Sequence, residues 1–197
     1  MLRSQITSYL FLCLRSRICN RFRVYREVSI RKVPAFCPKG FSETWHFDAM
    51  AMEGQRASGK MPFAILGFEI KSCRQDFLSD TKWRNYLGRV DRFIFVCPPG
   101  AVTKADVKGT PAGIWEIEPA VTGNCLWCKE VKAHPMDVTN EARFDAMYGM
   151  AINANRFSIA FPTKEDVLLK EQLGRQWYQE LNRPIVASKK PDIPKER

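Results

Sequence analysis

The chain has 197 residues, of which 45% are hydrophobic, and a formal net charge of +10. This length suits one domain with a terminal extension or two small domains, and the apolar content can build a core without disulfides. No apolar run approaches the about 20 residues that cross a bilayer, so a membrane-spanning protein is excluded. The seven cysteines, an odd number, favour a reducing compartment, which we expect to be the cytoplasm of a bacterial or phage-infected cell.

Positive charge is concentrated at the N-terminus, where residues 1–35 hold eight Lys and Arg residues against one acid, Glu27, a net charge of +7. Apolar residues at helical spacing predict an amphipathic helix over about residues 5–20, packed on the body of the protein. A basic segment of this kind favours DNA as the partner. The side chains that we expect to neutralise phosphates are Arg15, Arg17, Arg21 and Arg23. A surface that docks on an acidic protein and an organelle transit peptide are the alternatives.

Three strands are predicted next, over residues 24–30, 45–52 and 63–71. Strict alternation would place on one side of the first strand the side chains of Val24, Arg26, Val28 and Ile30. In the second strand the same rule places two groups on opposite faces: Trp45, Phe47 and Ala49 on one, and His46, Asp48 and Met50 on the other. The third strand begins with an unbroken apolar run, which is typical of a central strand covered on both faces.

The second half of the chain predicts a helix from an N-cap at Ser72 to about Leu87, and then a buried strand over residues 91–97. The remaining predicted elements are outer strands at 113–117 and 125–131 and helices at 139–156 and 163–181. The corresponding domain prediction is a core with its basic helix over 1–132, a helical extension over 133–185 and a disordered tail over 186–197. The helical extension is also a candidate surface for a homodimer.

Charged side chains lie at one end of the second and third strands. Glu69 and Lys71 are two residues apart on one strand, so they point to the same face, near Asp48 on the neighbouring strand. Two carboxylates with an adjacent lysine can hold a divalent ion and activate water, as phosphodiester cleavage requires. The alternative is an ordinary cross-strand ion pair, which would contribute little to stability. However, a carboxylate at the end of such an apolar strand is costly to bury without a partner.

These residues carry a family resemblance. Phe47-Asp48 and Glu69-Ile70-Lys71, in the order helix, three strands, helix, strand, resemble the core of the PD-(D/E)XK nuclease superfamily. The segment from Phe68 through Lys82-Trp83, Asp91-Arg92-Phe93 and Pro98-Pro99-Gly100 is similar to MmcB-like DNA-repair proteins and to nuclease-like proteins of phages. The resemblance covers about residues 24–132. It implies an α/β (α+β) fold with a restriction-endonuclease-like core, in which helices flank a central mixed β-sheet.

The resemblance also implies roles for single residues. Asp48, Glu69 and the backbone carbonyl of Ile70 would be ligands of Mg²⁺ or Mn²⁺, and Lys71 would act on the attacking water or on the developing charge. Many members of the superfamily supply a further Glu from the first helix. Residues 1–26 contain no acid, so Glu27 is the nearby candidate for that ligand.

The helix after the motif would place Lys82 and Tyr86 on one face, where they could contact a phosphate and a base; a solvated face is the alternative. His46, two residues before Asp48, is a candidate to support the site or an ordinary surface histidine. The sequence therefore predicts a metal-dependent DNA nuclease of repair or of phage and mobile-element recombination. The alternatives are a catalytically weak or inactive DNA-binding module and a module that binds a host protein.

Overall fold

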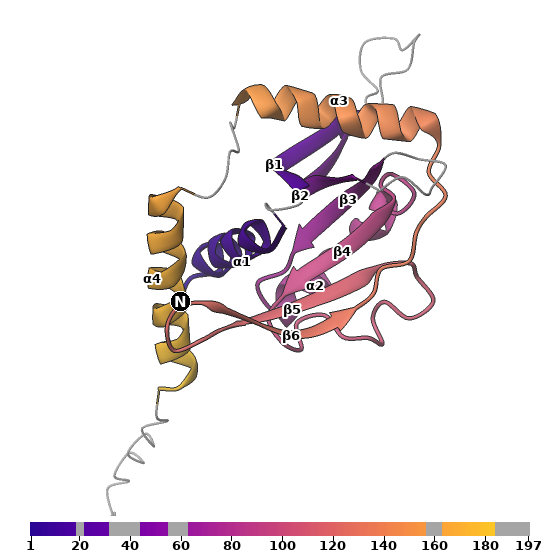
Figure 1. The fold of residues 1–197 in the computed structure, drawn as a ribbon. Helices are drawn as coiled ribbons and strands as arrows, with labels where there is room; N and C mark the ends of the chain where they lie inside the picture. Colours follow the sequence, from indigo (N-terminus) through magenta and orange to yellow (C-terminus); the bar gives the residue numbers. More distant parts are fainter. Residues whose placement is uncertain (19–21, 32–43, 55–62, 157–162, 184–197) are drawn as a thin grey trace, which may run out of the picture.

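The computed structural model describes residues 1–18, 22–31, 44–54, 63–156 and 163–183. One mixed sheet of six strands, in the order β1-β2-β3-β4-β5-β6, forms its centre (Figure 1). Its strands are β1 (Phe22–Arg31), β2 (Thr44–Gly54), β3 (Phe63–Ile70), β4 (Arg92–Cys97), β5 (Gly113–Pro119) and β6 (Cys125–Val131). The first three strands are antiparallel, β3, β4 and β5 are parallel, and β6 returns antiparallel to β5. The predicted fold class, a mixed sheet flanked by helices, is confirmed.

Two hydrophobic clusters cover the two faces of the sheet. One cluster combines β1, β3 and β4 side chains with α1 (Arg3–Ile18) and α4 (Lys164–Leu181). The other combines the opposite strand faces with α2 (Arg74–Ser79), the short 3-10 helix η1 (Trp83–Tyr86) and α3 (Asn140–Arg156). In Figure 1, α1 lies between α4 and the sheet, and α3 lies across β1 and β2. Among the described residues, no helix combines the length and the apolar character that crossing a membrane requires.

The predicted amphipathic N-terminal helix is instead buried over most of its circumference. Residues from Tyr9 through Arg15 and Ile18 are all buried, because α1 is covered by the sheet on one side and by α4 on the other. Tyr9 donates a hydrogen bond of 2.9 Å to the carbonyl of Asn124 in the β5–β6 turn. The turn itself approaches α4 so closely that a Cβ on Gly174 would lie 2.2 Å from the carbonyl oxygen of Gly123.

The C-terminal helices contribute to both clusters. Ala146 and Met150 of α3 belong to one and Leu173 and Trp177 of α4 to the other. Arg143 of α3 forms an ion pair with the buried carboxylate of Asp91, which also accepts a 2.8 Å hydrogen bond from the amide of Ile65. On the outer side of α3, apolar side chains remain exposed, and this is where the predicted homodimer contact would form: Phe144, Met147, Tyr148 and Ile152. The predicted disordered tail, residues 186–197, lies outside the described residues.

The predicted helix over residues 72–87 is wrong in its extent and in its N-cap. α2 ends at Ser79, because Asp80 adopts an extended backbone with ψ 104°. The carboxylate of Asp80 then accepts a 2.8 Å hydrogen bond from the amide of Lys82, and such a local bond competes with helical hydrogen bonds. The N-cap residue is Cys73, and Ser72 donates from its amide and its hydroxyl to Asp76. Lys82 precedes η1, so the argument that Lys82 and Tyr86 share one helical face does not hold.

A glycine in β3 lets β2 approach the site. A Cβ added to Gly67 would lie 2.6 Å from Cε1 of Phe47 and 3.1 Å from a methyl group of Val90. The Phe47 ring therefore occupies the space above Gly67, and Phe47 directly precedes Asp48. This contact sets the position of β2 where it carries its carboxylate.

We expect Gly67→Ala to lower the free energy of unfolding by about 1–3 kcal/mol, because the added methyl overpacks against the Phe47 ring. Chemical denaturation measures the effect. In a Phe47→Leu background the same methyl should cost less, and the double-mutant cycle isolates the contact. Equal costs in both backgrounds would contradict the assignment.

Candidate active site

The alternation of side chains breaks in β1 and β2 at the same level of the sheet. Val24 packs in the α1 cluster, whereas Val28 and Ile30 pack in the opposite cluster. In β2, Trp45 and Phe47 share the cluster of Met50, while Ala49 and Ala51 pack on the other face. The predicted groupings, Val24 with Val28 and Phe47 with Ala49, are therefore wrong.

Glu27 marks this irregularity. It lies between the paired residues Arg26↔Ala49 and Val28↔Phe47, hence opposite Asp48. Its φ is 50°, the left-handed region, and no other non-glycine among the described residues has a positive φ. The register of β1 and β2 is the same on both sides of Glu27, so no extra residue is inserted; strained residues of this kind occur often at functional sites. The break places Asp48 beside the end of β3 rather than in a regular strand position.

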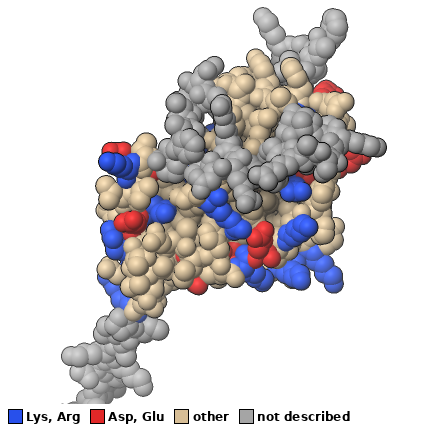
Figure 2. Space-filling view, in the orientation of Figure 1, with Lys and Arg blue, Asp and Glu red and all other residues tan. Residues whose placement is uncertain are grey.

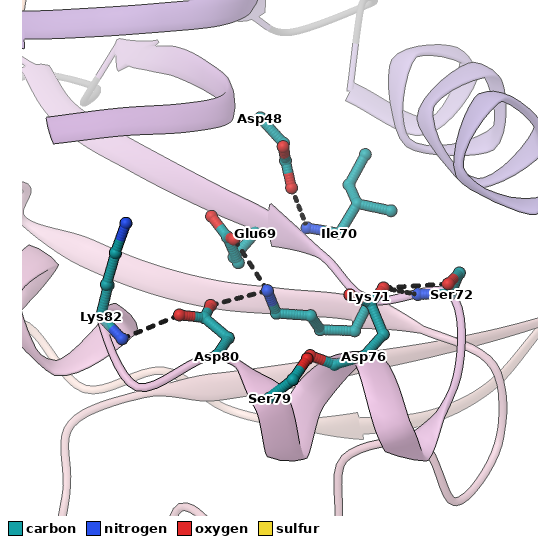
Figure 3. Close-up of polar contacts among 9 residues, drawn as sticks. All are labelled: Asp48, Glu69, Ile70, Lys71, Ser72, Asp76, Ser79, Asp80 and Lys82. Carbon is teal, nitrogen blue, oxygen red and sulfur yellow. Dashed lines mark hydrogen bonds and ion pairs between the residues drawn. The ribbon is translucent and has the colours of Figure 1, made fainter. Parts of the chain in front are cut away.

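Asp48 replaces a backbone acceptor at the edge of the β2–β3 ladder. The pairing of these strands ends at Ala49↔Phe68. Beyond it, Oδ2 of Asp48 accepts a 2.7 Å hydrogen bond from the amide of Ile70 (Figure 3). One carboxylate oxygen is thus fixed by the backbone of the E-x-K segment.

Lys71 lies between two carboxylates. Its Nζ donates to Oε1 of Glu69 at 2.9 Å and to Oδ2 of Asp80 at 2.7 Å, as Figure 3 shows. Glu69 is 8% exposed and Lys71 is 5% exposed, so these charges face each other largely without water. The other oxygen of Glu69, Oε2, is buried and has no hydrogen-bond partner among the described residues.

The pKa values of the cluster follow from burial and from neighbouring charges. Burial and the charge of Asp48 raise the pKa of Glu69 to about 8, although Lys71 acts in the opposite direction. Burial also raises the pKa of Asp48, partly offset by the Ile70 amide. Burial alone would lower the pKa of Lys71, but Glu69 and Asp80 outweigh it and hold the pKa above its ordinary value. The pKa of Asp80 falls because the bonds from Lys71 and from the Lys82 amide outweigh its partial burial.

The cluster can accept a cation at one place. The unbonded Oε2 of Glu69 and the carboxylate of Asp48 are oxygen groups close enough for the charge of Asp48 to raise the pKa of Glu69. Mg²⁺ is commonly held by one or two carboxylates, with waters and substrate phosphates completing its shell. Within the described parts of the chain, no group of three or more His, Cys, Asp and Glu side chains is arranged to hold a metal. Glu27 is exposed and pairs with Arg26 at 3.4 Å.

A pocket of about 660 Å³ adjoins the cluster. Its described lining consists of Thr44, Trp45, His46, Lys82, Asn85, Tyr86 and Arg89. Burial, and after it the charges of Glu69 and Asp80, raise the pKa of Tyr86 to about 12, so its hydroxyl stays protonated. The structure therefore brings Lys82 and Tyr86 together at one pocket, although not by the predicted helical face.

The N-terminal arginines do not gather at this site. Arg15 is 9% exposed and pairs with Asp166 of α4 at 2.9 Å. Arg17 pairs with Glu130 at 2.9 Å and lies over the rings of Trp115 and Trp127. Arg21 and the side chain of Arg23 lie outside the described residues. Figure 2 shows Lys and Arg mixed with Asp and Glu over the displayed face, rather than one uniform basic surface.

Asp80 is the site residue that sequence reasoning missed. In the predicted helix it would have been one polar position among several. Its role depends on the chain leaving the helix at Ser79, which brings its carboxylate to Lys71. The only local signal was that Asp, Asn and Ser often end helices through side-chain bonds to nearby amides.

Comparison with known proteins finds a similar solved structure but no family. No family model matches the sequence, and no curated protein matches it. A solved structure of a protein of unknown function from Silicibacter pomeroyi is similar, at 21% identity over 73% of this chain and 84% of that chain, with a TM-score of 0.47. Its function is unknown, so the function of this chain has to be inferred from its own residues.

The raised pKa of Glu69 gives a stability difference that depends on pH. A carboxyl that is protonated more readily in the folded state takes up a proton on folding, so its contribution to stability falls as pH rises from about 4.5 to about 8. We therefore expect Glu69→Gln to gain stability relative to wild type across this range, by at most about 1.4 kcal/mol per pH unit. Urea unfolding in the presence of a chelator measures it. A difference independent of pH would show that Glu69 ionises normally.

Proposed function

We propose that the chain is a metal-dependent DNA nuclease-like protein, which hydrolyses phosphodiester bonds at the cluster of Asp48, Glu69 and Lys71. The observation that carries the proposal is the buried, unpartnered Oε2 of Glu69 beside Asp48 and a cationic Lys71. An unpaired buried carboxylate oxygen lowers the stability of the fold, and such groups occur often at functional sites, where they bind or react. The resemblance to PD-(D/E)XK nucleases implies the same three residues.

Asp48, Glu69 and the carbonyl of Ile70 would hold Mg²⁺ or Mn²⁺. When bound, such an ion polarises the phosphate and lowers the pKa of its water. Binding favours the ionised forms of both carboxylates, whose pKa values are raised in its absence. Glu27, opposite Asp48, is the residue of the described chain best placed to add a further oxygen from β1.

The two ion pairs of Lys71 favour for it the role of a fixed positive charge. Its pKa is raised, so the ammonium stays protonated at neutral pH and does not serve as the base. A protonated amine beside the reacting phosphate stabilises the negative charge that develops as the water oxygen bonds to phosphorus and the ester P–O bond breaks. The attacking water gives up its proton to solvent water, and the oxygen of the leaving strand end takes a proton from solvent and becomes a hydroxyl. Asp80 is a positioning residue, because it holds the Lys71 ammonium at 2.7 Å without reaching the reacting atoms itself.

A second candidate function is DNA binding without cleavage on the same fold. It is favoured by the scarcity of ligands: within the described residues, no group of three candidate metal-binding side chains is arranged around a common point. In addition, the exposed carboxylate of Glu27 already pairs with Arg26. The two candidates differ only in whether the protein cleaves the DNA that it binds, so one experiment separates them.

Cleavage of labelled single-stranded, duplex, flap and junction DNA with Mg²⁺ or Mn²⁺ tests the proposal. We expect cutting that a chelator abolishes, and a rate about 100-fold or more lower in Lys71→Ala, because a preorganised charge is lost from the transition state. Asp80→Asn should lower the rate less and shift the pH profile, since the Lys71 ammonium loses one of its two anchors.

Lys164→Ala is the matched control for loss of one positive charge, because Lys164 is exposed on α4, which covers the opposite face of the sheet. DNA binding with no cutting by wild type, under any metal, would reject the nuclease and leave the DNA-binding module.

Metal binding has a readout that does not depend on activity. We expect Mn²⁺ at about 100 times its Kd to raise the free energy of unfolding by about 2.7 kcal/mol. Asp48→Asn should lose this gain, yet stay folded, since its side-chain oxygen can still accept from the Ile70 amide. Equal Mn²⁺ stabilisation of wild type and Asp48→Asn would place the ion elsewhere.

Glu27→Gly separates the strain at this position from its carboxylate. Without metal, the glycine should be more stable by about 1 kcal/mol, because φ 50° costs a residue with a side chain. If Glu27 is a ligand, the same variant should bind Mn²⁺ more weakly. An unchanged Mn²⁺ affinity would remove Glu27 from the metal site.

A further inference from the structure

The pocket beside the cluster is rich in donors and positive charge. Lys82 and Arg89 form no ion pair with an acid in the described part of the chain, and no Asp or Glu belongs to the described lining. Asn85, Thr44 and the protonated Tyr86 add neutral donors. A ligand that fits these groups is anionic and carries several acceptor oxygens.

Two of the donors are held in place. The guanidinium of Arg89 lies 3.9 Å from the centre of the buried Trp45 ring, which fixes its plane and leaves its N–H edge for a planar or phosphate partner. Nδ1 of His46 lies 2.9 Å from the hydroxyl of Ser29. When Nδ1 accepts that hydroxyl proton, Nε2 carries the ring N–H and can donate to a ligand. The pocket is therefore partly preorganised.

Size and position narrow the ligand class. A volume of about 660 Å³ exceeds what a single phosphate group fills and falls in the range of pockets for nucleotide-sized ligands. The pocket adjoins the cluster through Asp80, which accepts a 2.8 Å hydrogen bond from the amide of the lining residue Lys82 and also binds the ammonium of Lys71. A ligand in the pocket is thus next to the residues that would act on a phosphodiester.

We propose that this pocket binds one nucleotide of an unpaired DNA strand, with its phosphate at Lys82 and Arg89 and its sugar or base near His46 and Asn85. A base that enters a pocket of this size has left its stack and its pairing partner, so single strands and frayed ends are favoured over blunt duplex. The place of this nucleotide beside the bond to be cut rests on the proposed function; binding by the pocket does not.

Binding in a chelating buffer, where no cleavage occurs, tests the proposal. Fluorescence anisotropy would compare a short labelled oligothymidylate with a blunt duplex of equal length, and thymidine monophosphate and inorganic phosphate would serve as competitors. We expect the single strand to bind about tenfold more tightly than the duplex. Lys82→Ala and Arg89→Gln should each weaken single-strand binding about tenfold. Each should also reduce the slope of log affinity against log salt concentration by about the amount of one phosphate contact.

Lys164→Ala again serves as the charge-matched control and should bind as wild type does. Loss of the Arg89–Trp45 contact could unfold the Arg89→Gln variant. Lys82 is exposed, so Lys82→Ala should stay folded and still test the pocket. Affinity unchanged in Lys82→Ala, or duplex bound as tightly as single strand, would overturn the proposal. Competition by inorganic phosphate as strong as that by the nucleotide would overturn it too, because the pocket would then recognise phosphate alone. Binding is measured in a chelating buffer and cleavage with Mg²⁺ or Mn²⁺, so a missing nuclease activity and a missing pocket function give different results.

Discussion

The ammonium of Lys71, bonded to Glu69 and Asp80, is the interaction on which the site depends. It joins the end of β3 to the segment that follows α2, and this segment carries Lys82, Tyr86 and Arg89 to the pocket. The buried carboxylate of Glu69 and the half-buried carboxylate of Asp80 share one ammonium, which leaves a net negative charge. Burial and the charge of Asp48 raise the pKa of Glu69, so that this carboxyl is protonated more readily than usual. A divalent cation or a phosphate environment would change that balance, which makes the cluster responsive to a ligand.

The paired irregularity at Glu27 and Asp48 shows how the sheet makes room for this chemistry. A regular β1–β2 ladder would keep Asp48 in one alternating row, as a polar residue on a covered face. The break in both strands releases Asp48 to bond the Ile70 amide and to face Glu69. The energetic cost is concentrated in one residue, Glu27, at φ 50°. Strain held next to a candidate site is consistent with a functional reason for it.

Because α1 is buried, two arginines of the basic N-terminus form ion pairs within the protein. Arg15 and Arg17, which a linear reading of charge places on a phosphate-binding arm, pair with Asp166 and Glu130 instead. Asp166 also forms the capping box of α4 with Thr163, so one carboxylate caps the beginning of α4 and anchors α1 through Arg15. Within the described residues, Lys82 and Arg89 of the pocket form no ion pair with an acid, which is why the proposed DNA contact is placed there rather than on α1.

The mixed sheet is expected through the family resemblance alone. The sequence by itself determined the order of strands and helices and the meeting of Asp48 with Glu69 and Lys71. These features follow from local periodicity and from the two-residue spacing along a strand, which short segments carry on their own. Only the tertiary structure decided that Asp80 completes the cluster, that alternation fails at Glu27, and that α1 is enclosed. In each case a contact between separate elements overrides a local preference. The ion pair with Lys71 holds Asp80 outside the helix, packing against β1 and β3 changes the alternation in β2, and α4 covers the side of α1 that would otherwise face solvent.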